Sequence, residues 1–385
     1  MEYINREELE MLVKDSSREP SVSLYMTTQK GRERARENAI RFKNLLAEAE
    51  KRLDSWEMNS SDKEQLLDPA KKLLDSSHYW ANQGEGFACF LNPGFYRFYR
   101  LPLPFTELAV VKESFHLKPL FSLLTMDGRF YVLAISRKDA RLLRATKTFC
   151  EEVDLSTLVE KFEAAFDDEL PESNLQFHTR APYAGGTRTA VFFGHGGDIE
   201  SIQKERLLQY FRFIDRELPR YMDTADGPLV LACVDYLAPL YREASSYPSL
   251  MEEIIRGNPE NRNNQEIHQK AWAIVKPYFE KPVQDIKNRY LELKGTGKTS
   301  NNVQELVKAA HRGRISDLLF VPGIQQWGRF NPQTGEAIPE SKAIPGSNDL
   351  IDFIVTRTFL NKGGIYALES EEMPDSSPAA ALFRW

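Results

Sequence analysis

The sequence predicts a mixed chain of α/β and α+β domains, three in all, on the basis of three observations. Its 385 residues supply enough apolar material for two or three hydrophobic cores. The 42% share of hydrophobic residues, beside 28% charged residues, is typical of soluble globular proteins. The spacing of apolar residues alternates between helical and strand-like along the chain. These patterns form three successive blocks, which we expect to be domains at residues 1–118, 119–298 and 299–385.

The first block, residues 1–118, is predicted to be a divergent N-terminal α+β domain. Apolar residues over 38–53 recur at spacings of three and four, which defines one buried face of a helix. An alternating stretch over 21–27, introduced by Pro20, predicts a strand. Further helices are expected at 5–14 and 61–75, and further strands at 86–91, 95–101 and 108–115.

The second block begins with short apolar runs at 121–125, 130–135 and 140–146, separated by tight polar turns. Such runs predict an antiparallel meander of three strands. Helices at 156–166 and 201–221 then alternate with strands at 189–193 and 228–234, and a long helix is predicted at 264–293. A meander followed by alternating helices and strands is the element order of a ribonuclease H-like sheet.

The third block, residues 299–385, alternates helices at 303–312 and 348–360 with strands at 317–321, 364–368 and 379–383. This alternation favours a small α/β/α sandwich, in which helices cover both faces of one sheet.

Composition excludes several classes of protein. No stretch approaches the roughly 20 consecutive apolar residues of a membrane span, and the first ten residues lack the features of a signal peptide, so we expect a cytoplasmic protein with no membrane partner. The three cysteines, Cys89, Cys150 and Cys233, are too far apart for a disulfide framework or a metal knuckle. With a formal net charge of -6, any contact with nucleic acid requires a local basic patch.

No metal site and no cofactor are expected. The six histidines are scattered without an HxxxH pair, and the sequence has no GxSxG elbow. Residues 295–299, Gly-Thr-Gly-Lys-Thr, resemble a phosphate loop, but its first glycine is replaced by Glu292. The predicted strand at 130–135 also lacks the carboxylates that a magnesium-dependent nuclease needs.

Two basic segments are candidate RNA contacts, because arginine donates paired hydrogen bonds to phosphate. The first consists of Lys30, Arg32, Arg34, Arg36, Arg41 and Lys43. The second lies on the helix predicted at 201–221 and consists of Lys204, Arg206 and Arg212. Each segment can also be an ordinary solvent-exposed helix surface, and Glu205, Asp215 and Glu217 on the second helix favour that alternative.

A glycine-rich segment, Gly194-His-Gly-Gly-Asp198, precedes the second basic segment. Glycine lets a loop pass through a narrow site and present its backbone N–H groups. A surface turn has the same composition, so both interpretations stay open.

Several motifs together resemble the bacterial branch of the archaeo-eukaryotic release factor and Pelota family. They are Phe115-His-Leu-Lys-Pro119, Phe130-Tyr-Val-Leu-Ala-Ile-Ser136, Pro228-Leu-Val-Leu-Ala232, Gly257-Asn-Pro259, Ala309-Ala-His-Arg-Gly-Arg314 and Ala379-Ala-Ala-Leu-Phe-Arg-Trp385. The resemblance covers nearly the whole chain. It implies a ribonuclease H-like middle domain and a C-terminal domain similar to the kink-turn-binding ribosomal proteins.

In release factors of this family, a Gly-Gly-Gln loop enters the peptidyl transferase centre. The best match here is Gly196 and Gly197, followed by Asp198 in place of glutamine. A carboxylate at that position would repel the surrounding phosphates. The family's codon-reading Asn-Ile-Lys-Ser tetrapeptide is also absent. The resemblance therefore implies neither glutamine-dependent hydrolysis nor recognition of a stop codon.

The expected function is a ribosome-associated translation factor that binds the ribosomal aminoacyl site for rescue or hibernation. Its expected partners are the ribosome and ribosomal RNA, with tRNA and a translational GTPase as further candidates. One alternative is a peptidyl-tRNA hydrolase, in which Gly196, Gly197 and Asp198 are the candidate catalytic residues. A second alternative is an RNA-binding adaptor that acts away from the ribosome through its C-terminal domain.

Overall fold

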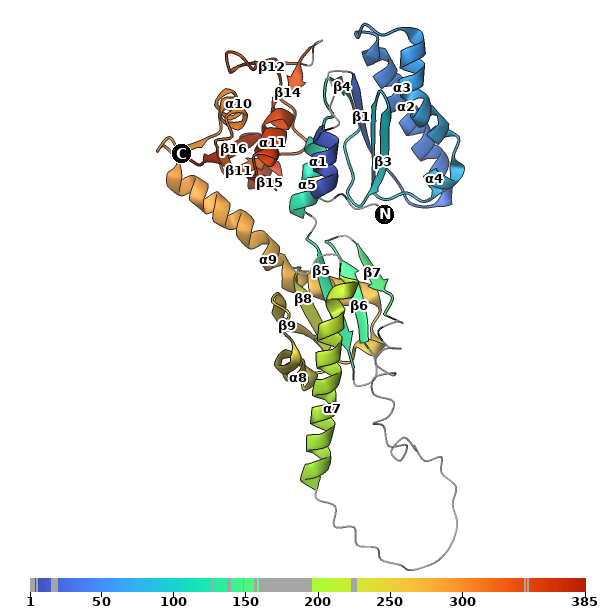
Figure 1. The fold of residues 1–385 in the computed structure, drawn as a ribbon, viewed down its shortest axis with the longest axis vertical. Coiled ribbons are helices and arrows are strands. Elements are labelled where there is room, and N and C mark those ends of the chain that lie inside the picture. Colours follow the sequence, from blue (N-terminus) through green and yellow to red (C-terminus); the bar gives the residue numbers. More distant parts are fainter. Residues whose placement is uncertain are drawn as a thin grey trace, which may run out of the picture. The chain divides into compact units, whose positions relative to one another are not determined.

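The structure, a computed structural model, divides the chain into two compact units (Figure 1). The first unit contains residues 1–127 and 280–385, and the second contains residues 128–279. The described residues are 4, 6–14, 20–126, 128–136, 140–147, 149–155, 158, 196–222, 227–342, 344 and 346–385.

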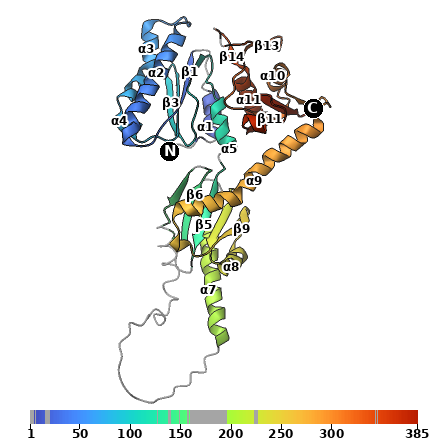
Figure 2. The same cartoon turned by 180° about the vertical axis from the view of Figure 1, so that it is seen from behind.

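The N-terminal part of the first unit is built on an antiparallel sheet in the order β3-β2-β1-β4. The strands are β1 (Ser21–Thr27), β2 (Gly86–Asn92), β3 (Phe95–Leu101) and β4 (Leu108–Lys112). Helices α2 (Ala35–Leu53), α3 (Ser60–Leu74) and α4 (Ser77–Ala81) cover one face, seen in both views (Figure 2). The other face shares a core with α1 (Arg6–Lys14) and α5 (Lys118–Met126).

The C-terminal part of the first unit has a sheet in the order β10-β16-β11-β15. These strands are β10 (Thr299–Ser300), β16 (Ala379–Phe383), β11 (Ile315–Phe320) and β15 (Gly364–Ala367). Helices α10 (Val303–His311) and α11 (Leu350–Leu360) pack on one face, and Tyr290 of α9 (Asn264–Leu293) packs on the other. A separate small sheet contains β12 (Trp327–Asn331), β13 (Glu336–Pro339) and β14 (Asn348–Asp349).

The second unit contains a five-stranded sheet in the order β7-β6-β5-β8-β9. The strands are β5 (Phe130–Ile135), β6 (Ala140–Ala145), β7 (Cys150–Val153), β8 (Leu229–Cys233) and β9 (Leu250–Arg256). The first three are antiparallel, whereas β8 is parallel to both β5 and β9. Helices α7 (Gly196–Glu217) and α8 (Leu237–Ala244) share a core with one face, and the first turns of α9 share a core with the other.

The strand predicted at 121–125 is wrong, because this segment lies in α5. Leu120, Phe121 and Leu123 join one core, and Pro119 occupies the start of the helix, where its missing N–H costs nothing. The antiparallel meander instead uses β7 as its third strand. The sequence patterns did not indicate α8, β9 or the small sheet of β12, β13 and β14.

The glycine segment before the second basic segment also differs from the expected loop. Gly196 and Gly197 begin α7, so their backbone is helical, and Asp198 follows them in the same turn. Of the helix predicted at 156–166, only Leu158 is described, and it is helical; the strand predicted at 189–193 and residues Gly194 and His195 lie outside the described residues. Among the helices that are described, none is both long enough and apolar enough to cross a membrane.

Candidate functional site

The first basic segment lies where β1 leads into α2, through the short 3-10 helix η1 (Arg32–Arg34). Gly31 turns the chain here with a φ of 106°, a value that favours glycine. The buried side chain of Asn38 stabilises this turn through two hydrogen bonds. It accepts a hydrogen bond from the backbone N–H of Gln29 (3.1 Å) and donates one to the Gln29 carbonyl (2.9 Å). The basic side chains are therefore presented by an anchored turn.

Three of the six predicted cations are paired with carboxylates. Arg34 contacts Glu37 at 3.0 Å, Arg41 contacts Glu107 at 2.7 Å, and Lys30 lies 3.7 Å from Glu85. Such exposed pairs weaken the attraction of these cations for an external phosphate, because a carboxylate already neutralises each charge.

The other three cations, Arg32, Arg36 and Lys43, are exposed and form no ion pair with any residue that the structure describes. Arg36 and Lys43 are seven residues apart on α2, a spacing that places both on one helix face. Ile40 lies between them and is 52% exposed. Three of the six cations in the first basic segment therefore have no ion pair within the described residues, and one exposed apolar side chain lies beside them.

The second basic segment, on α7, is more fully compensated. Lys204 lies 3.7 Å from Glu243 of α8, and Arg212 lies 3.8 Å from Glu205. Within the described part of the chain, only Arg206 of the three predicted contacts has no ion pair. This arrangement supports the alternative of a solvent-exposed face with alternating charges.

Asp215 of α7 is not part of that solvent-exposed face. It is 8% exposed and accepts hydrogen bonds from the Ser245 hydroxyl (2.5 Å) and from the backbone N–H and hydroxyl of Ser246 (2.7 and 2.9 Å). The Tyr241 hydroxyl lies 3.4 Å from the same carboxylate. Asp215 therefore ties α7 to the turn after α8, a role that the sequence pattern did not reveal.

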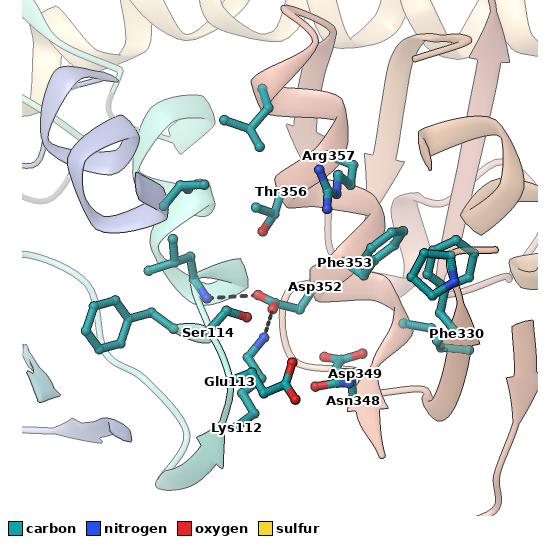
Figure 3. Close-up of a pocket in the computed structure, with 16 residues that line it drawn as sticks. Lys112, Glu113, Ser114, Phe330, Asn348, Asp349, Asp352, Phe353, Thr356 and Arg357 are labelled. Carbon is teal, nitrogen blue, oxygen red and sulfur yellow. Dashed lines mark hydrogen bonds and ion pairs between the residues drawn. The ribbon is translucent and has the colours of Figure 1, made fainter. Parts of the chain in front are cut away.

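A buried charge cluster in the first unit connects its N-terminal and C-terminal parts (Figure 3). Asp352, in the first turn of α11, contacts the Lys112 ammonium at 2.5 Å. Its other oxygen accepts hydrogen bonds from the backbone N–H groups of Leu117 and Lys118 at 2.8 and 2.7 Å. The connection between β4 and α5 is thereby fixed to the start of α11.

Lys118 and His116 extend this cluster. Lys118 Nζ contacts Asp349, the N-cap residue of α11, at 2.6 Å, and both side chains are fully buried. The ring of His116 is also fully buried, with Nδ1 3.5 Å from Asp352. Burial alone raises the pKa of Asp352, but Lys112 and His116 more than offset this effect, so that its pKa lies well below the usual range.

A cavity of about 480 Å³ lies beside this cluster. Its walls combine Phe330 and Phe353, whose ring centroids are 4.7 Å apart, with Lys112 and Asp352 (Figure 3). Each of the two buried charged groups already has a partner within the protein. We therefore assign the cluster to holding the first unit together. Among the described residues, no group of three or more His, Cys, Asp or Glu side chains could hold a metal ion.

The comparison with known families addresses the second unit and the start of the C-terminal part. The family model of bacterial archaeo-eukaryotic release factor family 3 matches residues 129–314. Over these residues, which make up just under half of the chain, the sequence is similar to that family. The match runs from β5 through the five-stranded sheet and α9 to the residue before β11. No protein of curated function matches the sequence.

Solved structures of release-factor and Pelota proteins are also similar to this chain. An archaeal translation termination factor, aRF1, has 13% identity and a TM-score of 0.26 over 99% of each chain. S. cerevisiae Dom34, a termination-like factor that interacts with Hbs1, has 11% identity and a TM-score of 0.39 over 76% of this chain and 73% of its own. Archaeoglobus fulgidus Pelota has 14% identity and a TM-score of 0.24 over 78% and 79%. These TM-scores are too low to establish a shared overall arrangement.

Proposed function

We propose that this protein is a ribosome-associated translation factor that occupies the ribosomal aminoacyl site, as a rescue or hibernation factor. The observation that carries this proposal is the match of residues 129–314 to a release-factor family. Ribosomal RNA is the proposed partner of Arg32, Arg36 and Lys43, since all three are exposed and lack an ion pair within the described residues. The cytoplasm is the corresponding proposed location.

We also propose a ribonuclease H-like architecture for the middle domain, residues 119–298. The strand order β7-β6-β5-β8-β9, with three antiparallel strands followed by two parallel ones, supports this assignment. For the C-terminal domain, residues 299–385, we propose the fold of the kink-turn-binding ribosomal proteins. Helices α10 and α11 on one face of the sheet β10-β16-β11-β15, with α9 from outside these residues on the other face, support this assignment.

The proposed factor does not use glutamine-dependent hydrolysis. Asp198 follows Gly196 and Gly197 where the catalytic tripeptide would have glutamine, and an ionised carboxylate would be repelled by the phosphates of the transferase centre. We expect no peptide release from stalled ribosomes by the natural sequence. Asp198→Gln tests this point directly, because release that appears only after this substitution would show that the natural loop is not catalytic. Release by the natural protein that is lost in Asp198→Ala would instead show a catalytic role for the carboxylate.

Co-sedimentation with bacterial ribosomes tests the leading proposal. We expect the purified chain to pellet stoichiometrically with vacant ribosomes or with ribosomes that carry peptidyl-tRNA, and ligands of the aminoacyl site should block pelleting. A salt series measures the electrostatic part of the affinity, because each neutralised phosphate steepens its dependence on salt. Absence of pelleting with both ribosome populations at low salt would contradict the proposal.

A further inference from the structure

Five cations gather at one end of the C-terminal sheet. In the order β10-β16-β11-β15, strand β16 is antiparallel to β10 and β11, and β15 is parallel to β11. The first residues of β10, β11 and β15 therefore lie at the same end as the last residue of β16. Lys298, Arg314, Lys362 and Arg384 directly flank these strand ends or lie one residue further out, and Arg312 follows α10. We call these five residues the basic edge.

Hydrogen bonds between the flanking segments confirm that the basic edge is continuous. The backbone N–H of Arg384 donates to the Arg314 carbonyl (2.8 Å), and that of Phe383 donates to the Lys298 carbonyl (2.8 Å). The Arg384 guanidinium donates to the backbone oxygen of Asn361 (2.6 Å), the residue before Lys362.

The Arg314 side chain is held in the same region. Its guanidinium donates to the backbone oxygen of Trp385 (2.6 Å), and its Cζ lies 5.2 Å from the centre of the Phe383 ring. Each guanidinium has five N–H groups, so Arg314 and Arg384 keep donors for a further partner.

Within the described part of the chain, no Asp or Glu side chain compensates the charges of the basic edge. None of its five side chains forms an ion pair with an Asp or Glu that the structure describes, and all except the half-buried Arg314 are exposed. The exposed helix α3 differs in this respect, because Lys63, Lys71 and Lys72 each contact a carboxylate within 3.1 Å. The basic edge is therefore a local concentration of positive charge on a chain whose net charge is -6.

Helix dipoles explain only part of this concentration. Both α10 and α11 end here, and cations stabilise the negative end of a helix dipole, which accounts for Arg312 and Lys362. The helix dipole does not account for Lys298, Arg314 or Arg384, which lie at the strand ends. Lys362 also has a φ of 58°, a conformation that glycine or asparagine adopts more easily than lysine.

We propose that the basic edge binds the sugar-phosphate backbone of RNA. Neighbouring strands are about 4.8 Å apart, so the strand ends present a row of cations to a continuous polyanion. Arginine matches phosphate geometry through its planar fork. Trp385 is 67% exposed beside this row, and bases stack on exposed aromatic rings. Together, these features favour a nucleic acid over an acidic polypeptide.

Fluorescence anisotropy of the full chain with a labelled single-stranded oligouridylate tests this inference. The test variant combines Arg312→Gln with Lys362→Asn, because asparagine tolerates the backbone conformation at residue 362. We expect the Kd to rise about tenfold. The slope of log K against log salt should become shallower by about 1.4, since each phosphate contact on a single strand contributes roughly 0.7.

The matched control combines Lys281→Gln with Lys342→Gln, two exposed lysines outside the basic edge whose loss changes the net charge equally. We expect the control to keep the slope of the natural protein. The same loss of slope in both variants, or no loss in either, would overturn the inference, as would tighter binding of polyglutamate than of oligouridylate. A loss confined to the test variant supports it even if the chain fails to pellet with ribosomes.

Discussion

At the scale of single residues, Asp352 has several structural roles. One carboxylate oxygen accepts two backbone N–H groups from the connection between β4 and α5, while the other contacts Lys112. Its side chain is 2% exposed, so water cannot replace any of these partners. A buried ion pair often adds little over a well-packed apolar pair, but the removal of one partner leaves an uncompensated charge.

The substitution Asp352→Asn should therefore destabilise the first unit by about 3–5 kcal/mol at neutral pH. The physical reason is that the Lys112 ammonium stays buried without its counter-charge. Urea unfolding monitored by circular dichroism measures this difference. Glu48→Gln, which removes one partner of the exposed Arg52–Glu48 pair on α2, is the control and should change stability by less than about 0.5 kcal/mol. Equal effects of the two substitutions would contradict the assigned role of Asp352.

The same carboxylate predicts a specific dependence on pH. The pKa of Asp352 is lower in the folded chain than in the unfolded chain, so its contribution to stability is complete above the unfolded value of about 3.9. It is lost progressively as the pH falls through that value toward the folded pKa. We expect the free energy of unfolding to decrease below about pH 5 in the natural protein and less steeply in Asp352→Asn. If the free energy of unfolding falls equally steeply with pH in both proteins, other carboxylates cause the loss of stability in acid.

At the scale of elements, the long periodic helices and most of the short core strands could be predicted from the sequence, whereas α8, β9 and the small sheet of β12, β13 and β14 could not. α2 and α9 have one repeating apolar face over many turns, and this pattern has few alternative interpretations. The apolar run at 121–125 is compatible with both a strand and a helix, and only its packing against the core favours the helix α5. β9 was not predicted, because most of its residues are exposed or half-buried and its sequence therefore shows no clear alternation of apolar and polar residues.

The candidate RNA contacts illustrate the same limit. The sequence identified the basic residues at the start of α2, but it could not show which of them are neutralised by Glu37, Glu85 and Glu107. These partners include residues far along the chain, and the distances depend on the fold. The cations of the basic edge are still harder to find, because the strand order of the C-terminal sheet brings them together from four segments.

The start of α2 therefore yields a prediction that separates free cations from paired ones. Replacing Arg32, Arg36 and Lys43 by glutamine should weaken ribosome pelleting and make its dependence on salt shallower, since up to three phosphate contacts are lost. The matched control replaces Lys30, Arg34 and Arg41, whose carboxylate partners already neutralise them. We expect a smaller effect from the control. Equal effects in sedimentation across a salt series would mean that the ion pairs open on binding.

At the scale of the whole molecule, the first unit depends on residues from both ends of the chain. A single core contains Leu9 of α1 and Phe121 of α5 together with Phe359 of α11. The Phe121 and Phe359 rings pack at 5.0 Å between centroids, and the Asp352 cluster crosses the same junction. Residues 299–385 thus share their core with the N-terminal part, whereas both faces of the second unit's sheet are covered by helices from residues 128–279.

Isolated fragments should consequently behave differently. A fragment of residues 280–385 exposes the α11 face that contacts α5, and it leaves Asp352 and Asp349 without Lys112 and Lys118. We expect it to unfold without a cooperative transition, while a fragment of residues 128–279 should show one, because its two core clusters come from its own residues. Thermal unfolding monitored by near-ultraviolet circular dichroism compares the two. Adding residues 1–127 in trans should restore cooperativity to the first fragment, and a cooperative transition of residues 280–385 alone would show that the shared core is dispensable.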